Sequence, residues 1–66
     1  MDLTNPTFLA GTKIIVARNS PGDLLAYEFL NKTGTVIGHQ MPYAVVDFGE
    51  DGIHPILERN LERFLG

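Results

Sequence analysis

The sequence predicts an all-β fold: a five-stranded, partly open barrel with a single helical turn before the last strand. Short runs of β-branched and aliphatic residues recur at close, regular spacing, and glycine-marked turns separate them. The strongest turn signal, Gly49-Glu50-Asp51-Gly52, contains an Asp-Gly pair, which readily adopts the positive φ of a tight hairpin. Several short strands joined by such turns are typical of small barrels.

The length of 66 residues allows a single domain. We expect an N-terminal arm over residues 1–10, anchored on the core by Phe8 and Leu9, and one barrel domain over residues 11–66. A domain this small buries only about 60% of its unfolded surface, so a compact core or self-association has to supply its stability. The chain has no cysteine, which excludes disulfides, thiolate zinc sites and cysteine nucleophiles.

Charge and hydropathy restrict the partners. Five Lys and Arg against eight Asp and Glu give a formal net charge of −3, which disfavours nucleic-acid phosphates and anionic membrane surfaces. No apolar run approaches the roughly 20 residues of a spanning helix. The N-terminus lacks the basic start of a signal peptide, so we expect a cytoplasmic protein with no membrane contact, and a nucleic-acid partner is disfavoured.

The first strand is expected over residues 12–17, with Ile14 and Val16 on the core face. Turn-forming residues follow, and residues 24–30 are then ambiguous. Asp23 can cap a short helical turn there, because its carboxylate can accept hydrogen bonds from exposed backbone amides. The run is too short for a helix that is stable alone. We therefore expect the irregular far half of a long loop, which enters a strand near Phe29.

The middle of the chain alternates turns and strands. Ala44, Val46 and Phe48 alternate with more polar neighbours and are expected on the core face of the second clear strand. Gly34 is interpreted as a backbone requirement rather than a phosphate-binding residue, because no glycine-rich loop leads into a helix. The expected elements are a turn at 31–34, a strand at 35–38, a chain break at 40–42 and a strand at 43–48.

The C-terminal part has two interpretations. Residues 53–57 are expected as a strand, and Pro55 indicates an edge or a bulge because it lacks an N–H. The spacing of Leu57, Leu61 and Phe64 then fits an amphipathic helix. The alternative is one helical turn at 58–60 followed by a strand from Leu61 to Phe64, which would cover an open sheet edge. We expect the turn and the strand.

The order of the segments carries a family likeness. The chain opens with Gly11-Thr12-Lys13-Ile14-Ile15-Val16 and, after a long loop, Lys32-Thr33-Gly34-Thr35-Val36; it continues with Tyr43-Ala44-Val45-Val46-Asp47-Phe48, Ile53-His54-Pro55-Ile56 and Asn60-Leu61-Glu62. This order resembles KOW-type and related SH3-like (Src-homology-3-like) barrels over most of the chain. Similar barrels occur in nitrile hydratase β-subunits, small photosynthetic accessory subunits, prophage proteins and the plasmid-borne trimethoprim-resistant dihydrofolate reductase. The pattern mostly encodes the fold and does not select a function.

The plasmid-borne reductase allows a direct comparison. Its active surface uses a Val-Gln-Ile-Tyr run on the strand matched here by Asp51-Gly52-Ile53-His54. The isoleucine is kept as Ile53. Gly52 stands in place of the glutamine and His54 in place of the tyrosine, so two of the ligand-contacting groups are missing.

No catalytic, cofactor or metal constellation is expected. His39 and His54 have carboxylates nearby in sequence, but their spacing does not place two metal ligands on one element, and solvent-facing histidines are the favoured interpretation. A nucleophile needs a base held by a third group, and the hydroxyls of Ser20, Thr33 and Thr35 have no such arrangement. We therefore favour a protein without enzymatic activity, cofactor or metal.

The long first loop and the turn near residue 41 carry the candidate binding residues. Tyr and Met are enriched at interfaces, and in SH3-like barrels the long first loop lies near the adjoining turns. A core role is the equal alternative for the two tyrosines and the methionine, whereas Phe29 is assigned to the core. The expected contact surface comprises residues 19–29 and 40–43, and its partner-binding residues are Tyr27, Met41, Tyr43 and Asp23.

Three functions remain open. The leading hypothesis is a small non-enzymatic protein-binding or accessory module, which includes a homo-oligomeric form and a phage or mobile-element origin. The second is an oligomeric ligand-binding enzyme of the plasmid-type reductase kind, motivated by Ile53 and the similar barrel. The third is a KOW-like nucleic-acid or ribosome-associated module, which requires Lys13, Arg18 and Lys32 on one face.

Overall fold

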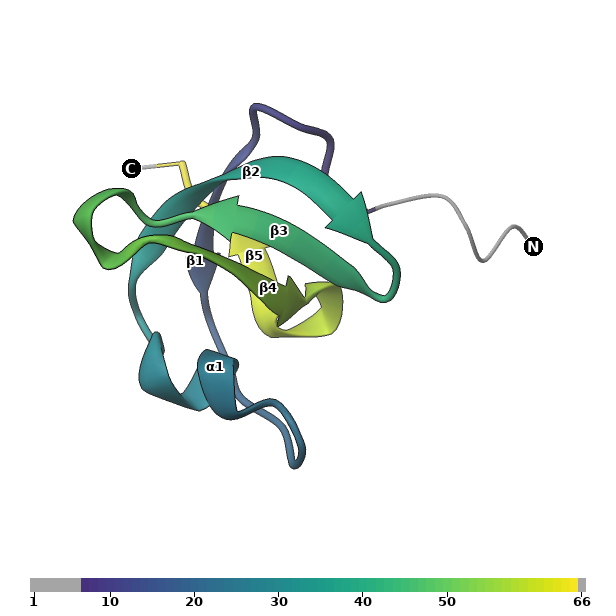
Figure 1. Ribbon diagram of the computed structural model, residues 1–66, viewed down its shortest axis with the longest axis vertical. Helices are drawn as coiled ribbons and strands as arrows, with labels where there is room; N and C mark the ends of the chain where they lie inside the picture. Colours follow the sequence, from purple (N-terminus) through teal and green to yellow (C-terminus); the bar gives the residue numbers. More distant parts are fainter. Residues whose placement is uncertain (1–6, 66) are drawn as a thin grey trace.

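The computed structural model describes residues 7–65 and confirms the expected mostly-β fold. Five antiparallel strands form one curled sheet in the order β4-β3-β2-β1-β5, with one short helix below it (Figure 1). The barrel is not closed, because β4 and β5 are the two edges of the sheet. The elements are β1 (Lys13–Val16), α1 (Leu24–Glu28), β2 (Thr33–Gln40), β3 (Tyr43–Asp47), the 3-10 turn η1 (Gly49–Asp51), β4 (Ile53–Leu57), the 3-10 turn η2 (Glu58–Asn60) and β5 (Leu61–Arg63).

The core fills the inside of the curled sheet. Ile14 and Val16 of β1 and Ala44 and Val46 of β3 are fully buried, so the two expected core faces are confirmed, and Phe48 packs against them half-buried. These positions alternate along their strands with more exposed ones, as the two-residue period of a strand requires. The remaining buried apolar side chains are Phe8, Ala26, Phe29, Val36, Ile56 and Leu61.

The expectation for residues 24–30 was wrong, because residues 24–28 form the helix α1 and no strand begins near Phe29. The side chain of Asp23 caps the helix by accepting a hydrogen bond from the Ala26 amide over 3.2 Å. Ala26 and Phe29 are buried in the core, and α1 packs against β4. Tertiary packing therefore supplies the stability that a helix of this length lacks by itself.

The expected turn at residues 31–34 is shorter in the structure, because β2 already begins at Thr33. Asn31 takes the positive φ of the turn, at 70°. Gly34 lies inside β2, where a Cβ atom would be 2.6 Å from Cγ1 of Val46 and 2.8 Å from the carbonyl oxygen of Asp47. The close approach of β2 to β3 thus explains why this position requires glycine.

The last two strands agree with the sequence. β4 with Pro55 is an edge strand, and η2 with β5 replaces the long amphipathic helix that was the rival interpretation. Pro55 and Leu57 occupy the positions of β4 whose backbone nitrogen faces away from β3, and the alternation of an antiparallel pair puts the Ile53 amide there as well. Two of these three edge nitrogens have no free N–H to offer another strand, since Pro55 has no N–H and the Leu57 amide donates to Asp23.

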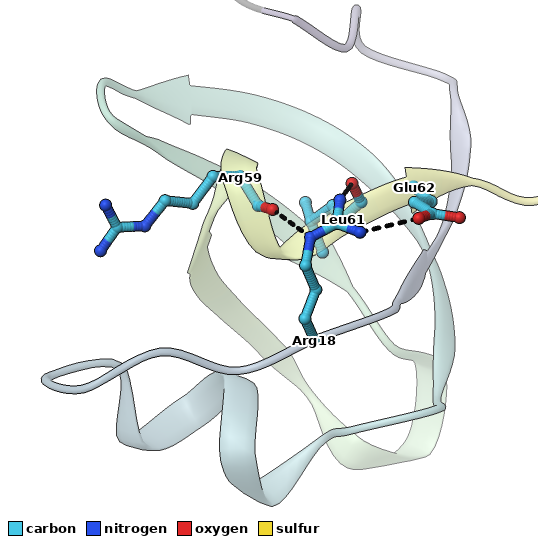
Figure 2. Close-up of polar contacts among 4 residues, drawn as sticks. All are labelled: Arg18, Arg59, Leu61 and Glu62. Atoms are coloured by element: carbon cyan, nitrogen blue, oxygen red, sulfur yellow. Dashed lines mark hydrogen bonds and ion pairs between the residues drawn. The ribbon is translucent and has the colours of Figure 1, made fainter.

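The loop between β1 and β2 ties the two sheet edges together. Oδ2 of Asp23 accepts hydrogen bonds from the Leu57 amide over 3.1 Å and from Nδ2 of Asn60 over 3.0 Å. Asp23 is 5% exposed and Asn60 is 2% exposed, so these bonds are shielded from water. Arg18 of the same loop reaches β5 and donates to the carbonyl of Leu61 (Figure 2). One loop therefore closes, with side chains, the gap that the strands leave open.

Replacing the Asp23 carboxylate tests this closure. In Asp23→Ala, the Leu57 amide, the Asn60 amide and the first turn of α1 lose their shared acceptor. Unpaired buried donors cost about 1–3 kcal/mol each, so we expect a loss of roughly 2–4 kcal/mol in the free energy of unfolding, measured by urea denaturation with circular dichroism.

The matched control is Asp51→Ala, which removes a carboxylate from a half-exposed pair with Lys32 at 3.1 Å. Pairs of this kind contribute about 0–1 kcal/mol, so little change is expected. Equal, small effects of both substitutions would contradict the role assigned to Asp23.

The two non-turn glycines of β2 give a second prediction. Gly34→Ala places a methyl group against the backbone of β3 and is expected to destabilise the domain by about 1–3 kcal/mol. Gly38→Ala in the same strand meets nothing within 4 Å and is expected to be neutral or slightly stabilising. Thermal unfolding of both variants measures the difference, and a Gly34→Ala variant as stable as Gly38→Ala would show that the two strands do not approach so closely.

Candidate functional site

An open groove lies at the end of the sheet where the β2–β3 turn, η2 and residues 7–8 meet. Its volume is about 570 Å³. We call it the end groove. Its apolar lining residues are Phe8, Met41, Pro42, Leu57 and Leu61, and its polar lining residues are Thr7, Arg18, Glu58 and Arg59.

Glu58 of the turn η2 is hydrogen-bonded to two other segments that line the end groove. Its carboxylate oxygen Oε2 accepts hydrogen bonds from the amides of Thr7, over 2.9 Å, and Phe8, over 3.3 Å. Its own amide donates to the carbonyl of Pro42 over 3.1 Å. Glu58 is buried, so this carboxylate serves as an internal anchor for the chain segment at residues 7–8.

The two arginines of the groove have different surroundings (Figure 2). The guanidinium of Arg18 donates to the carbonyl oxygens of Arg59 and Leu61 and forms an ion pair with Glu62 at 2.7 Å. The side chain of Arg59 points away from this cluster, and its Nη2 lies 3.4 Å from the hydroxyl of Ser20. Arg18 is thus part of the scaffold, whereas the Arg59 guanidinium has a neutral neighbour.

The predicted binding residues divide into two groups. Tyr27, Met41 and Tyr43 lie at the surface with exposed fractions of 72%, 39% and 37%, so none of them completes the core. Met41 lines the end groove, and Tyr43 follows Pro42 and pairs with Leu57 across β3 and β4. Asp23 is buried, and its carboxylate holds the fold together. Phe29 is in the core, as expected.

In the structure, the β1–β2 loop and the β2–β3 turn both lie beside the end of β4. Asp23, just before α1, bonds to Leu57, and Leu57 lies opposite Tyr43 at the start of β3. The exposed tyrosine of α1, Tyr27, does not line the end groove. The predicted surface therefore contains the groove residues Met41 and Pro42 and two exposed tyrosines outside the groove.

Sequence reasoning missed most of the groove. It treated Phe8 only as an anchor of the arm, a role that the burial of Phe8 confirms and the exposure of Leu9 does not. It gave no role to Arg59. The spacing of Leu57 and Leu61 was interpreted as fitting an amphipathic helix and not as part of a binding groove. The signal that could have pointed to the groove is the charged turn Glu58–Arg59 between two apolar segments.

A second apolar surface covers the outer side of β3 and β4. The residues that alternate with the core positions face away from the core, and Tyr43 lies opposite Leu57 and Val45 opposite Pro55. Ile53 at the far end is 55% exposed, and the half-buried Asp47 lies opposite it on the same face. We call this surface the outer patch, which consists of Tyr43, Val45, Ile53, Pro55 and Leu57.

The rings of His39 and His54 each contact a backbone carbonyl oxygen. The ring of His54 lies 4.8 Å from the ring of Phe29, and its Nε2 is 2.8 Å from the carbonyl of Asp51. A ring nitrogen of His39 contacts the carbonyl of Phe8. The two half-buried imidazoles are therefore packing residues. Residues 7–65 contain no group of three or more His, Asp or Glu side chains placed to hold a metal ion.

Two of the three cations required for a nucleic-acid surface are paired with carboxylates. Arg18 pairs with Glu62, and Lys32 lies 3.1 Å from Asp51. Phosphate binding would compete with these pairs. Within the described residues, no helix has the length and apolarity that crossing a membrane demands.

Comparison of the chain with protein-family models, with curated proteins and with solved structures found no match.

Proposed function

We propose that this chain is a small non-enzymatic protein-binding or accessory module, and that its partner contacts the end groove and the neighbouring exposed side chains. The observation that supports this function is the composition of the groove. Apolar side chains from three separate parts of the chain form most of its lining, and Met41 remains 39% exposed there. Concave, largely apolar surfaces with a few fixed polar groups are typical of binding sites.

The fold supports the same class of function. We infer an SH3-like barrel from the strand order β4-β3-β2-β1-β5, the long loop between β1 and β2 and the 3-10 turn that precedes β5. This inference concerns architecture. A fold of this kind carries many functions, so the groove residues, and not the fold, are the basis of the proposal.

A self-associating form of the module is supported by the outer patch. Ile53 and Tyr43 are exposed apolar side chains on this face, with the half-buried Val45, Pro55 and Leu57 between and beside them. Burying a side chain of this size contributes about 1.5–3 kcal/mol. A second copy of the chain is one partner that could cover the face.

The reductase and nucleic-acid alternatives gain less support. The position of the reductase tyrosine holds His54, whose ring packs against Phe29, and the position of its glutamine holds Gly52, which has no side chain. The cations of a nucleic-acid surface include the paired Arg18 and Lys32. No specific contact favours either function over protein binding.

A substitution in the groove tests the proposal. Met41→Glu places a charge on the apolar lining, whereas Leu30→Glu places the same charge at a position that is 38% exposed and outside the lining. In quantitative affinity purification from the cells that make the protein, we expect the wild type and Leu30→Glu to recover the same protein, and Met41→Glu to recover at least about tenfold less.

Unchanged recovery with Met41→Glu would remove the groove from the interface. Recovery of no protein by the wild type, together with measurable turnover of a metabolite, would replace the proposal by an enzymatic function.

The self-associating form makes a separate prediction. Size-exclusion chromatography with light scattering should give a mass above that of one chain for the wild type. Ile53→Asp in the outer patch should return the mass to that of a monomer, because the charge would be buried in the interface. The control is Leu9→Asp, because Leu9 is an exposed aliphatic residue outside the patch. A monomeric wild type at high concentration would contradict self-association.

A further inference from the structure

We propose that the end groove binds a short acidic and apolar segment of a partner protein, with an apolar side chain in the groove and a carboxylate on Arg59. This inference rests on the proposed protein-binding function and names the chemistry of the partner. It is argued from the lining of the groove and from the partners of each charged group there.

The walls of the groove favour an apolar side chain. Phe8, Met41 and Leu57 come from the N-terminal part of the described chain, the β2–β3 turn and the end of β4, and they converge on one cavity. Its volume of about 570 Å³ falls in the range of roughly 300–1,000 Å³ that is typical of ligand pockets. A cavity of this size admits side chains of a short segment rather than a large domain surface.

One oxygen of the carboxylate that lines the groove is already engaged by the fold. Glu58 is buried and accepts two backbone hydrogen bonds, from Thr7 and Phe8. A basic ligand group at Oε2 would have to compete with these two donors. This oxygen therefore serves the fold, and Arg59 is the charged lining residue whose printed side-chain partner is neutral.

Arg18 and Arg59 are the basic residues among those that line the groove. Arg18 is balanced by Glu62, so its charge is locally compensated. The ion pairs within residues 7–65 are Arg18 with Glu62 and Lys32 with Asp51, and Arg59 takes part in neither. Arg59 lines the groove, and its guanidinium lies near the neutral Ser20 hydroxyl and keeps further N–H donors.

A carboxylate is the ligand group that matches these donors. Guanidinium and carboxylate groups form charge-assisted hydrogen bonds with two parallel contacts, stronger than bonds between neutral groups. A nucleic-acid strand also carries anions, but its repeated phosphates require several cations, and Arg18 is already paired with Glu62. The combination of apolar walls and a lining arginine, Arg59, that forms no ion pair within residues 7–65 favours an acidic, apolar peptide.

Fluorescence anisotropy with a defined probe tests the inference on the full chain. The probe is a fluorescein-labelled peptide of sequence Gly-Glu-Leu-Phe-Glu-Leu with an amidated C-terminus. Matched peptides replace both glutamates by glutamine or by lysine, and a labelled oligothymidine represents nucleic acid. We expect the glutamate peptide to bind about tenfold more tightly than the glutamine peptide, and the lysine peptide and oligothymidine more weakly still.

Three variants locate the binding. Arg59→Gln should weaken the glutamate peptide about tenfold and leave the glutamine peptide unchanged, because only the charge contact is lost. Arg63→Gln is the matched control, since Arg63 is exposed on β5 and does not line the groove. Met41→Gln should weaken both peptides, and circular dichroism confirms that each variant is folded. In nitrogen-proton spectra, the amides of Phe8, Leu57 and Leu61 should shift on addition of the peptide.

The outcomes separate this inference from the function on which it rests. No preference for the glutamate peptide, an equal effect of Arg63→Gln, or tighter binding of oligothymidine or the lysine peptide would overturn the partner chemistry. If Met41→Glu still abolishes recovery of a protein partner in that case, protein binding stands and only the acidic peptide is excluded. If the peptide shows no preference and Met41→Glu also leaves the recovery of a partner unchanged, both the acidic-peptide proposal and the binding role of the groove are overturned.

Discussion

The buried carboxylate of Asp23 holds the open sheet together. Because β4 and β5 do not pair with one another, no backbone ladder joins the two edges. Oδ2 of Asp23 instead bonds the Leu57 amide and the Asn60 side chain, and Oδ1 bonds the Ala26 amide at the start of α1. One side chain thus connects a loop, a helix, an edge strand and a 3-10 turn. The loss of one or two such bonds is a large share of the stability of a domain this small.

The same closure positions the candidate site. Unpaired sheet edges invite strand addition from other chains, and the β1–β2 loop occupies both edges with Asp23 on one side and Arg18 on the other. With η2 held in this way, Glu58 faces the amides of residues 7–8, and the side chain of Arg59 projects from the turn. The shape of the end groove is therefore a consequence of side-chain hydrogen bonds, and its walls come from segments that no single strand pair would bring together.

The predictable parts of this structure are those governed by local pattern. The alternation at Ile14 and Val16, the missing N–H of Pro55 and the turn before β5 each depend on near neighbours. The helix α1 was missed because its stability comes from packing against β4, which is distant in sequence, and from its cap Asp23, which is held by residues 34 and 37 positions away. The groove was missed for the same reason, since Glu58 and its partner Thr7 are 51 positions apart. Interface composition identified Tyr27, Met41 and Tyr43 as surface candidates, and these three side chains are exposed. Asp23 was also assigned to the contact surface, because the sequence does not show that its carboxylate faces inward.

Amide hydrogen exchange at Leu57 tests the closure of the sheet most directly. The amides of Ile53 and Leu57 occupy equivalent positions on β4, both directed away from β3. Only the Leu57 amide meets the Asp23 carboxylate. If that bond closes the sheet, the Leu57 amide exchanges at least about a hundredfold more slowly than the Ile53 amide, at a rate close to that of the core strands. Equally fast exchange at the two positions would contradict it and show that the Asp23 carboxylate does not hold the edge strand β4.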